Sequence, residues 1–319
     1  MTTVVTTRRL PRAVEDELKR RYTVRALDGE FAPPRAAILS ACQGADILFK
    51  TAGDPMPADM VAELPPSIRM VASFGAAIEL MDVKALAARG IEVSNTPGAV
   101  TDDTADLAFG LIIAACRRFA EADRLVRSGA WKGVTVTGML GHKVSGKILG
   151  VVGMGRIGSA VAKRAQGFGM TLLYHNRKPS AEAEALKARY CARLDDLLRE
   201  ADIVVLCCPM TPETHHLIDA AALKKMKRAA VIVNVARGAV IDEAALVQAL
   251  QDGTIAAAGL DVYEFEPKIE QALLDLPNTV LLPHLGTATE EARVAMGMRA
   301  IDNIEAFLKT GKAEDRVTP

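Results

Sequence analysis

The stretch that decides the fold is K-I-L-G-V-V-G-M-G-R-I-G, at residues 147–158. Its first half, Ile148–Val152, is short, apolar and β-branched, which is typical of a strand buried on both faces. Helical apolar spacing follows Gly158, so the glycines fall in a strand-to-helix turn. There Gly153 would permit the tight turn, Gly155 would let a pyrophosphate approach the backbone, and Gly158 would let the helix pack close to the strand. The stretch predicts a dinucleotide site, although glycine-rich turns without a ligand are also common.

Composition limits the classes of protein to which the chain can belong. Its 319 residues suit two domains, and half of them are hydrophobic, as in soluble α/β proteins. Lys plus Arg equals Asp plus Glu, 39 each, so no nucleic acid or anionic membrane is expected as a partner. We see no signal peptide, and the longest apolar run, 107–116, is too short to span a bilayer, so a cytoplasmic protein is expected. The cysteines form no C-x-x-C pair and no histidine has metal-ligand spacing, so no metal is expected.

Strand-like and helical runs alternate along the chain, which implies parallel sheets. A breaker cluster, N-T-P-G at 95–98, separates two sets of strands. Five strands are predicted before it, at 3–7, 24–27, 46–49, 70–74 and 91–93, and six after it, at 148–152, 171–174, 203–207, 230–234, 256–260 and 279–282. The second set matches a doubly wound dinucleotide-binding fold. The segment 288–309 is predicted to be one long amphipathic helix that returns to the first domain.

A helix is predicted at 101–118, and its segment 105–116 is apolar on nearly every face. A helix that is apolar all round is buried. Because this helix opens a domain, we expect it to be buried against a second copy of the chain in a homodimer; the alternative is burial inside one chain.

The nucleotide can be inferred from the end of the second strand of the dinucleotide-binding set, Y-H-N-R-K at 174–178. NAD-binding units place an acidic residue about twenty positions after the glycines, on the ribose hydroxyls. Here no acid occurs before Glu182. A guanidinium offers a forked contact to a 2′-phosphate. Arg177, with Asn176 and Lys178, therefore predicts a preference for NADP(H), with NAD(H) as a possible second cofactor.

Three polar residues follow predicted strands, where a doubly wound sheet places its chemistry. Arg237 lies in N-V-A-R-G, where Gly238 would allow a sharp turn; Glu266 lies in D-V-Y-E-F-E-P, and His284 in L-L-P-H-L-G. Reduction of a 2-keto acid needs a fixed carboxylate, a hydride donor and an acid for the carbonyl oxygen. Arginine can anchor the carboxylate, and histidine can supply the proton if a carboxylate favours its imidazolium. Each residue alone is more often solvated or structural, but the set in this order is specific.

The motifs N-T-P-G, G-M-G-R-I-G, N-V-A-R-G, D-V-Y-E-F-E-P and P-H-L-G together resemble the ordered signatures of the NAD(P)-dependent D-isomer-specific 2-hydroxyacid dehydrogenases, over essentially the whole chain. The resemblance implies two Rossmann-like domains with the active site in the cleft between them. It implies a discontinuous substrate domain, 1–99 plus 285–319, and a dinucleotide-binding domain, 100–284. The basic segment 176–178 resembles the glyoxylate/hydroxypyruvate reductase branch, which favours NADPH.

The resemblance also implies site residues. Arg237, Glu266 and His284 would be the catalytic set. Cofactor contacts are expected from Thr104, Gly153, Gly155, Arg156, Ile157, Gly158, Asn176, Arg177, Lys178, Cys208, Pro209, Thr214, Val235, Asp261 and Gly286. Substrate contacts are expected from Lys50, Gly75, Ala76, Ala77, Arg237 and His284.

The substrate loop, S-F-G-A-A-I-E at 73–79, departs from the family pattern, which usually has Gly at Ala77 and Asp or Asn at Glu79. The expected activity is NADPH-dependent reduction of glyoxylate or hydroxypyruvate. Another family substrate, either bulkier or phosphorylated, is an alternative. The loops of the first domain contain few basic residues, which argues against a phosphorylated substrate, but Lys50 keeps that alternative open. A nucleotide-sensing, corepressor-like interaction protein is a further alternative, and the intact Arg/Glu/His set favours an enzyme over it.

Overall fold

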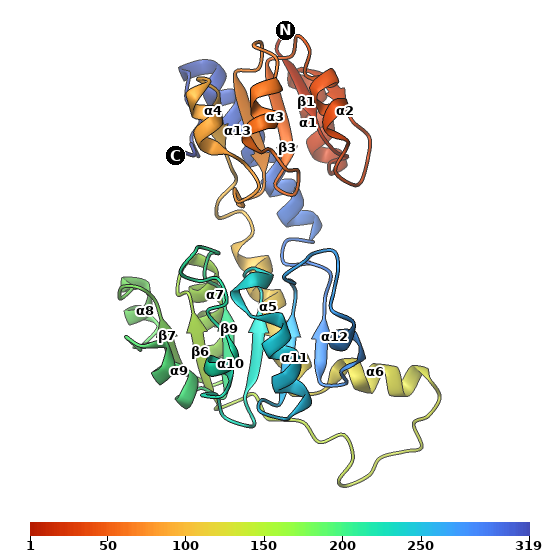
Figure 1. The fold of residues 1–319 in the computed structure, drawn as a ribbon, viewed down its shortest axis with the longest axis vertical. Helices are drawn as coiled ribbons and strands as arrows, with labels where there is room; N and C mark the ends of the chain where they lie inside the picture. Colours follow the sequence, from red (N-terminus) through yellow and green to blue (C-terminus); the bar gives the residue numbers. More distant parts are fainter. The chain divides into compact units, whose positions relative to one another are not determined.

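The computed structural model describes residues 1–319 and divides them into two compact units, residues 1–100 with 288–319 and residues 101–287 (Figure 1). Each unit is an α/β structure built on its own parallel sheet. This confirms the fold class predicted from the alternation of strands and helices. None of the helices combines the length and the apolar character that crossing a membrane requires.

The first unit has a five-stranded sheet in the order β2-β1-β3-β4-β5. Its strands are β1 (Thr3–Thr6), β2 (Thr23–Ala26), β3 (Ile47–Thr51), β4 (Met70–Phe74) and β5 (Glu92–Ser94). Its helices are α1 (Arg12–Arg21), α2 (Arg35–Ala41), α3 (Ala58–Glu63), α4 (Val83–Ala88) and α13 (Glu290–Thr310). Alternate residues of the central strands enter two cores: Phe49 and Ala72 pack with α1 and α13, whereas Leu48 and Val71 pack with residues of α2, α3 and α4.

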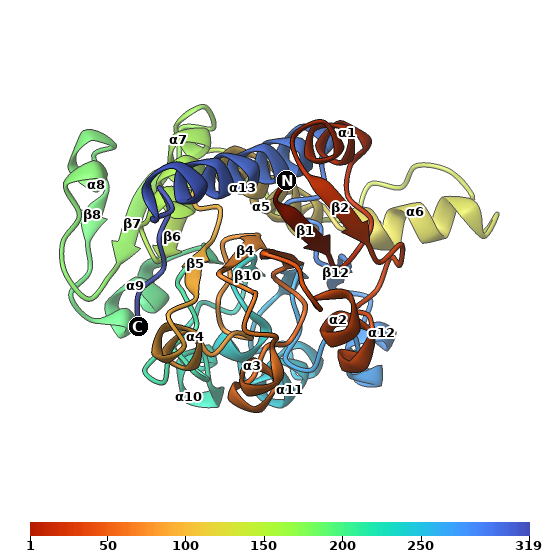
Figure 2. The same ribbon diagram turned by 90° about the horizontal axis from the view of Figure 1, so that it is seen from above.

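The last helix, α13, belongs to the first unit although it comes from the end of the chain. Thr289 caps its start by accepting a hydrogen bond from the Ala292 N–H at 3.0 Å, and Gly311, with φ of 80°, ends it. The helix packs on β4 and beside α1, as Figure 2 shows. Gly297 permits this packing, because a Cβ there would overlap the side chain of Val14.

The second unit has a seven-stranded parallel sheet in the order β12-β11-β10-β9-β6-β7-β8. Its strands are β6 (Ile148–Val152), β7 (Thr171–His175), β8 (Arg189–Tyr190), β9 (Ile203–Leu206), β10 (Val231–Asn234), β11 (Ala257–Leu260) and β12 (Thr279–Leu281). The six predicted strands are all present. The seventh, β8, was not predicted, because two residues are too few to show a periodic pattern.

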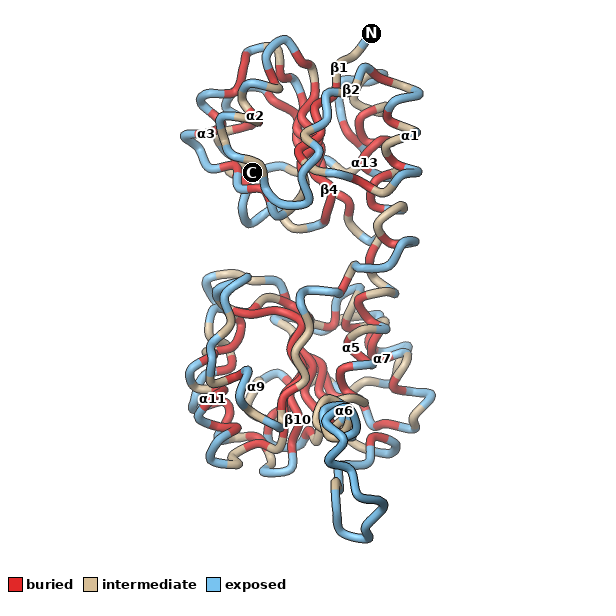
Figure 3. Tube along the Cα trace, turned by 90° about the vertical axis from the view of Figure 1, so that its right-hand side faces the viewer, coloured by how far each residue is buried: buried red, intermediate tan, exposed pale blue.

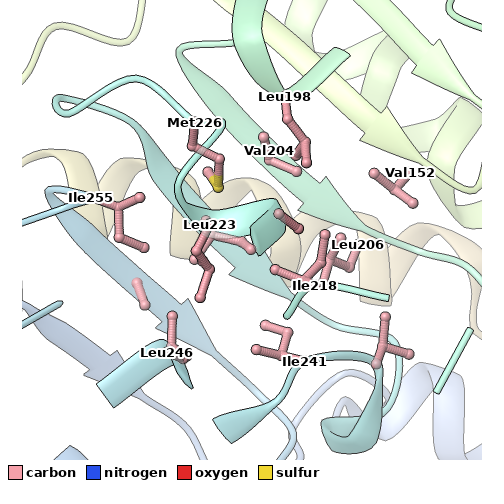
Figure 4. Packing of buried hydrophobic residues seen from close by; sticks show 14 of the residues in the cluster. Val152, Leu198, Val204, Leu206, Ile218, Leu223, Met226, Ile241, Leu246 and Ile255 are labelled. Atoms are coloured by element: carbon pink, nitrogen blue, oxygen red, sulfur yellow. The ribbon is translucent and has the colours of Figure 1, made fainter. Parts of the chain in front are cut away.

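Helices cover both faces of this second sheet, and its strands form the buried layer (Figure 3). The helices are α5 (Thr101–Cys116), α6 (Phe119–Arg127), α7 (Arg156–Gln166), α8 (Ala181–Ala185), α9 (Leu194–Glu200), α10 (Ala220–Leu223), α11 (Glu243–Gln251), α12 (Gln271–Asp275) and the 3₁₀ helix η1 (Gly238–Val240). Figure 4 shows one of the two cores, in which Val204 and Leu206 of β9 pack with Ile218, Leu223 and Leu246.

Helix α5 corrects the prediction for residues 101–118. It ends at Cys116, and Arg118 adopts a left-handed conformation with φ of 57° before α6 begins. Its apolar residues, among them Ala108 and Ile112, are buried against α7, β10 and β11 of the same unit. The burial of these residues is thus supplied within one chain, and a homodimer through this helix stays a prediction.

Exposed apolar side chains lie instead on α6 and on the segment that follows it. Helix α6 contains no buried residue, and the chain after it loops out from the unit (Figure 1) before it returns at Leu140, whose carbonyl accepts a hydrogen bond from Arg118. We call these exposed residues the arm surface; they are Phe119, Val126, Trp131, Val134, Val136 and Leu140.

Candidate active site

The three glycines after β6 occupy three different environments. Gly153 has φ of 96°, and a Cβ there would lie 2.5 Å from the Cys208 nitrogen. Beside Gly155 an added Cβ would meet no atom within 4 Å, so open space adjoins its backbone. A Cβ on Gly158 would overlap the carbonyl oxygen of Gly153, so this glycine permits close packing of α7 on the turn. The turn, the open backbone and the start of α7 form a cradle suited to a pyrophosphate.

Basic side chains follow β7 beside this turn. Asn176 supports the turn itself, because its Oδ1 accepts a hydrogen bond from the Met154 N–H at 2.7 Å. Arg177 and Lys178 are exposed and make no hydrogen bond or ion pair. Arg177 contributes to lowering the pKa of Glu213, although the hydrogen bond from Thr211 is the main cause. Of the three predicted residues, Asn176 therefore has a structural partner, whereas the two cations are open to a ligand.

The residues after β9 are predicted cofactor contacts, and the structure shows what holds them. The hydroxyl of Thr214 donates to the Pro209 carbonyl at 2.7 Å and accepts from the Thr211 N–H at 2.7 Å, which closes the turn 209–214. Cys208 is buried with its backbone against Gly153. The side chain of Thr214 thus shapes this turn.

Arg237 lies in a loop that a buried asparagine supports. Asn234, at the end of β10, accepts a hydrogen bond from the Ala236 N–H at 3.0 Å and donates one to the Arg237 carbonyl at 2.9 Å. The Arg237 guanidinium is partly exposed and donates to the Ala236 carbonyl at 2.7 Å. Gly238 begins the 3₁₀ turn η1 without a positive φ, and glycine is required there because a Cβ would overlap the backbone of Tyr263.

His284 and Glu266 form a hydrogen-bonded pair. The Nδ1 atom of His284 lies 2.8 Å from Oε2 of Glu266, whose Oε1 accepts the Tyr263 N–H at 2.9 Å. The bond to Glu266 raises the pKa of His284 above its ordinary value, against opposing effects of burial and of Arg237. Burial alone would raise the pKa of Glu266, but the bonds from His284 and Tyr263 lower it below its ordinary value. The pair therefore favours an imidazolium beside a carboxylate, and Nε2 is the ring nitrogen opposite the pair.

Asp261 holds the loop that carries His284. Its Oδ1 accepts the Leu285 N–H at 2.6 Å and its Oδ2 accepts the Gly286 N–H at 2.8 Å, while the His284 N–H donates to the Asp261 carbonyl at 2.9 Å. Thr104 donates its hydroxyl to the Gly286 carbonyl at 2.9 Å. Burial raises the pKa of Asp261, and the two N–H bonds oppose this. Backbone N–H groups thus bind both carboxylate oxygens of Asp261. We infer that Asp261 positions this loop, in which His284 adopts a φ of 56°.

Sequence reasoning missed the buried polar residues that support this site. Besides Asn234, they include Tyr263, whose hydroxyl donates to the Leu282 carbonyl at 2.9 Å, and Glu243, which accepts the Glu264 N–H at 3.0 Å. Asn234 and Tyr263 stand inside the motifs N-V-A-R-G and D-V-Y-E-F-E-P. For Asn234, the signal available in the sequence was a polar residue at the end of a strand that is otherwise apolar.

Two neighbouring histidines lie close to an acidic residue that is distant in the sequence. His215 and His216 belong to a turn before α10. The Nε2 atom of His216 lies 2.8 Å from Oε1 of Glu264, and the two imidazole rings stack at 4.0 Å. Ligand atoms of these three residues lie within 4.8 Å of one another, so they are the one group of the chain that could hold a metal ion. The sequence did not predict this possible metal site, because Glu264 is far from the two histidines in the chain.

The predicted substrate loop follows β4 in the first unit. Gly75 has φ of 134°, and its N–H donates to the Thr96 hydroxyl at 3.0 Å. The Ile78 N–H donates to Glu79 at 2.9 Å. The N–H groups of Ala76 and Ala77 make no hydrogen bond, so these two are the donors that the loop can offer to an anion.

Comparison with known proteins gives a consistent set of relatives. The family model for the NAD-binding domain of D-isomer-specific 2-hydroxyacid dehydrogenases matches residues 109–286. A glyoxylate reductase of Thermococcus litoralis is 42% identical over 312 residues, which cover 96% of this chain and 93% of that protein. The structure of a glyoxylate reductase from Paecilomyes thermophila has a TM-score of 0.87 and 36% identity, covering 99% of this chain and 98% of that one. The structure of an NADPH-dependent glyoxylate/hydroxypyruvate reductase from Sinorhizobium meliloti, in complex with NADP and malonate, has a TM-score of 0.87 and 33% identity. The match covers 99% of this chain and 96% of that one.

Proposed function

Because this chain belongs to the D-isomer-specific 2-hydroxyacid dehydrogenase family, we propose that it is an NADPH-dependent reductase of small 2-keto acids, with glyoxylate and hydroxypyruvate as substrates. The product is the D-hydroxy acid where a stereocentre forms. The observation that carries the proposal is the His284–Glu266 pair, in which the bond to Glu266 raises the pKa of the histidine. A reaction that develops negative charge on a carbonyl oxygen needs such a proton donor. The relatives named above support the choice of glyoxylate.

The residues of the second unit fit a nicotinamide dinucleotide. Gly155 and the start of α7 would hold the pyrophosphate, because open space adjoins that backbone. Arg177 would hold a 2′-phosphate, since its guanidinium is exposed and has no other hydrogen-bond partner. When bound, the reduced nicotinamide supplies the hydride for the keto carbon. The exposed Lys178 adds positive charge beside Arg177, which favours NADPH over NADH.

The chain's own groups supply binding and the proton. Arg237 anchors the substrate carboxylate. In the first unit, the N–H groups of Ala76 and Ala77 are free donors for an anion. His284 gives the proton on Nε2 to the carbonyl oxygen, and Glu266 holds the ring and stabilises the imidazolium. Asp261 and Asn234 act as positioning residues, because each fixes the backbone that carries a catalytic side chain.

The first experiment measures loss of reduced-nicotinamide absorbance with NADPH or NADH against glyoxylate, hydroxypyruvate, pyruvate and phenylpyruvate. We expect turnover with NADPH above NADH on glyoxylate and hydroxypyruvate. Binding of nucleotide without turnover of any acid would contradict the proposed function.

The cofactor preference has its own test in Arg177→Ala. Loss of one charge-assisted contact to the 2′-phosphate, about 1.5–3 kcal/mol, should lower kcat/KM for NADPH while leaving that for NADH nearly unchanged. The ratio of the two cofactors within one variant controls for any general damage. An unchanged ratio would remove Arg177 from the cofactor site.

We also propose that the chain is a homodimer through the arm surface. Helix α6 has no buried residue, and Val134 and Val136 are 92% and 95% exposed. Apolar side chains gathered on an extended segment indicate a partner surface. A second copy is the occupant that we propose, because its own arm surface offers matching apolar side chains.

A further inference from the structure

Three metal-ligating side chains of the second unit, His215, His216 and Glu264, form a compact group outside the proposed catalytic set. One ligand atom from each lies within 4.8 Å of the other two. Ligand atoms of one tetrahedral zinc ion are roughly 3.3–3.6 Å apart, because each lies about 2.0–2.2 Å from the metal. A small movement of the side chains would therefore bring all three onto one ion, and His215 is exposed and can make it.

The backbone of the turn places the two imidazole rings side by side. Successive side chains point to opposite faces of a strand and are about 100° apart around a helix, so neighbouring rings do not stack in either. Here His216 adopts a left-handed conformation with φ of 49°, and its ring stacks on that of His215 with 4.0 Å between the centroids. The His216 N–H donates to the Ala239 carbonyl at 2.8 Å and so holds this conformation. Both rings are thus held close to Glu264.

The carboxylate of the group lacks a permanent positive partner. The side chain of Glu264 is only 14% exposed, and its one ion-pair partner is His216, whose Nε2 lies 2.8 Å from Oε1. No lysine or arginine pairs with it. The Glu264 N–H donates to Glu243, a second buried carboxylate that also has no lysine or arginine partner. Buried charges are normally paired or coordinate a metal, and a divalent cation would offset this negative charge.

The kind of ligand atom selects the kind of metal. Two imidazole nitrogens and one carboxylate oxygen suit Zn²⁺ and the neighbouring divalent transition metals. Mg²⁺ and Ca²⁺ are bound by oxygen ligands and do not suit two imidazoles. Three protein ligands leave the fourth position of a tetrahedral zinc ion to water.

We propose that His215, His216 and Glu264 bind one zinc ion, which links the turn after β9 to the loop after β11. Both segments already pack on η1: His216 bonds to the Ala239 carbonyl, and the backbone of Glu264 lies against Gly238 so closely that a Cβ there would overlap it. The ion adds a direct link between the two segments. It has no part in the proposed hydride transfer, so the site stands whether or not the chain reduces keto acids.

The test measures Zn²⁺ binding to the full chain, freed of metal with a chelator, by isothermal titration calorimetry. The wild type should bind one equivalent, and Mg²⁺ should not compete for it. His215→Gln, His216→Gln and Glu264→Gln should each weaken binding by about 100-fold or more, since loss of a group that only supports a metal ligand already costs roughly 10–100-fold. His142→Gln is the matched control, because His142 is an exposed histidine of the same unit outside the group. It should keep the wild-type affinity.

Thermal unfolding distinguishes a site built by the fold from two histidines that bind zinc on their own. His216 and Glu264 are 48 residues apart in the chain, so only the folded chain presents all three ligands together. Zn²⁺ at about 100 times its dissociation constant should favour the folded wild type by about 100-fold and raise its Tm. Glu264→Gln should lose most of this rise. The difference between the two proteins is the readout, because any binding of zinc to thiols of the unfolded chain is common to both.

The exposed His215 keeps the test decisive if Glu264→Gln is unstable. Without metal, His215→Gln should unfold at the wild-type Tm, because the replaced ring is exposed, and with zinc it should gain less than the wild type. No bound equivalent of zinc in the wild type would overturn the site. Equal zinc affinity in the wild type, His215→Gln and Glu264→Gln, or an equal shift of Tm in all three, would overturn it as well.

Discussion

At the scale of single residues, Arg237 is the group whose loss should be most costly. In Arg237→Ala the substrate carboxylate loses its guanidinium, and we expect kcat/KM for glyoxylate to fall by roughly 2–5 kcal/mol of transition-state stabilisation. Arg228→Ala is the control, because Arg228 is an exposed arginine just before β10 that makes no hydrogen bond or ion pair. Near-normal kinetics for Arg237→Ala would refute its role as the carboxylate anchor.

His284 sets the pH dependence of the reduction. The acid must be protonated to act, and its pKa is raised by Glu266, so activity should be full below that raised pKa and fall as pH rises through it. Glu266→Gln removes the leading cause of the raised pKa. The falling limb of the kcat/KM profile should therefore move to lower pH, and the maximum should decrease.

The pH profile distinguishes this role from a merely structural one. Glu270→Gln is the control, because Glu270 is an exposed carboxylate of the same loop region, just before α12. It should reproduce the wild-type profile. If Glu266→Gln lowered activity equally at every pH, the carboxylate would support only the loop, not the protonation of His284.

At the scale of elements, the Arg237 loop and the Glu266 loop depend on each other through one close contact. A Cβ on Gly238 would overlap the backbone of Tyr263, whose N–H binds Glu266. Gly238→Ala should therefore separate the two loops, lowering kcat/KM and also destabilising the fold by roughly 1–3 kcal/mol. Activity assays and thermal unfolding measure the two effects.

The chain offers a matched glycine for this comparison. Gly110 is an exposed residue of α5, and an added Cβ there would meet no atom within 4 Å. Gly110→Ala should raise stability by about 0.5–1 kcal/mol, because alanine has the higher helix propensity. A Gly238→Ala variant as stable and active as wild type would show that the two loops tolerate separation.

These elements also show what could be predicted from sequence. The β6–α7 turn was predictable because its glycine requirements are local: a positive φ at Gly153 and a close approach at Gly158. The supporting role of Asn234 and the backbone bonds of Asp261 were not predictable, since their partners are fixed by tertiary packing. Helix α5 illustrates the same limit, because apolarity on all faces predicts burial but does not say against what.

At the scale of the whole molecule, the proposed dimer is the remaining question. The wild-type chain should have, by light scattering during gel filtration, twice the 34.0 kDa mass of one chain. In a variant with Val134→Lys and Val136→Lys the charges would be desolvated at the interface, so the mass should fall toward that of one chain. Thermal unfolding of that variant at low concentration should resemble that of the wild-type monomer, because both valines are exposed within the chain.

Phe31→Lys controls for the general effect of replacing an exposed apolar residue with a cation. Phe31 is 84% exposed and lies in the first unit, outside the arm surface, so this variant should keep the wild-type mass. A monomeric wild type would contradict the dimer outright. A dimer unaffected by the two lysines would instead move the interface to another surface, and the exposure of Val134 and Val136 would then need a different partner.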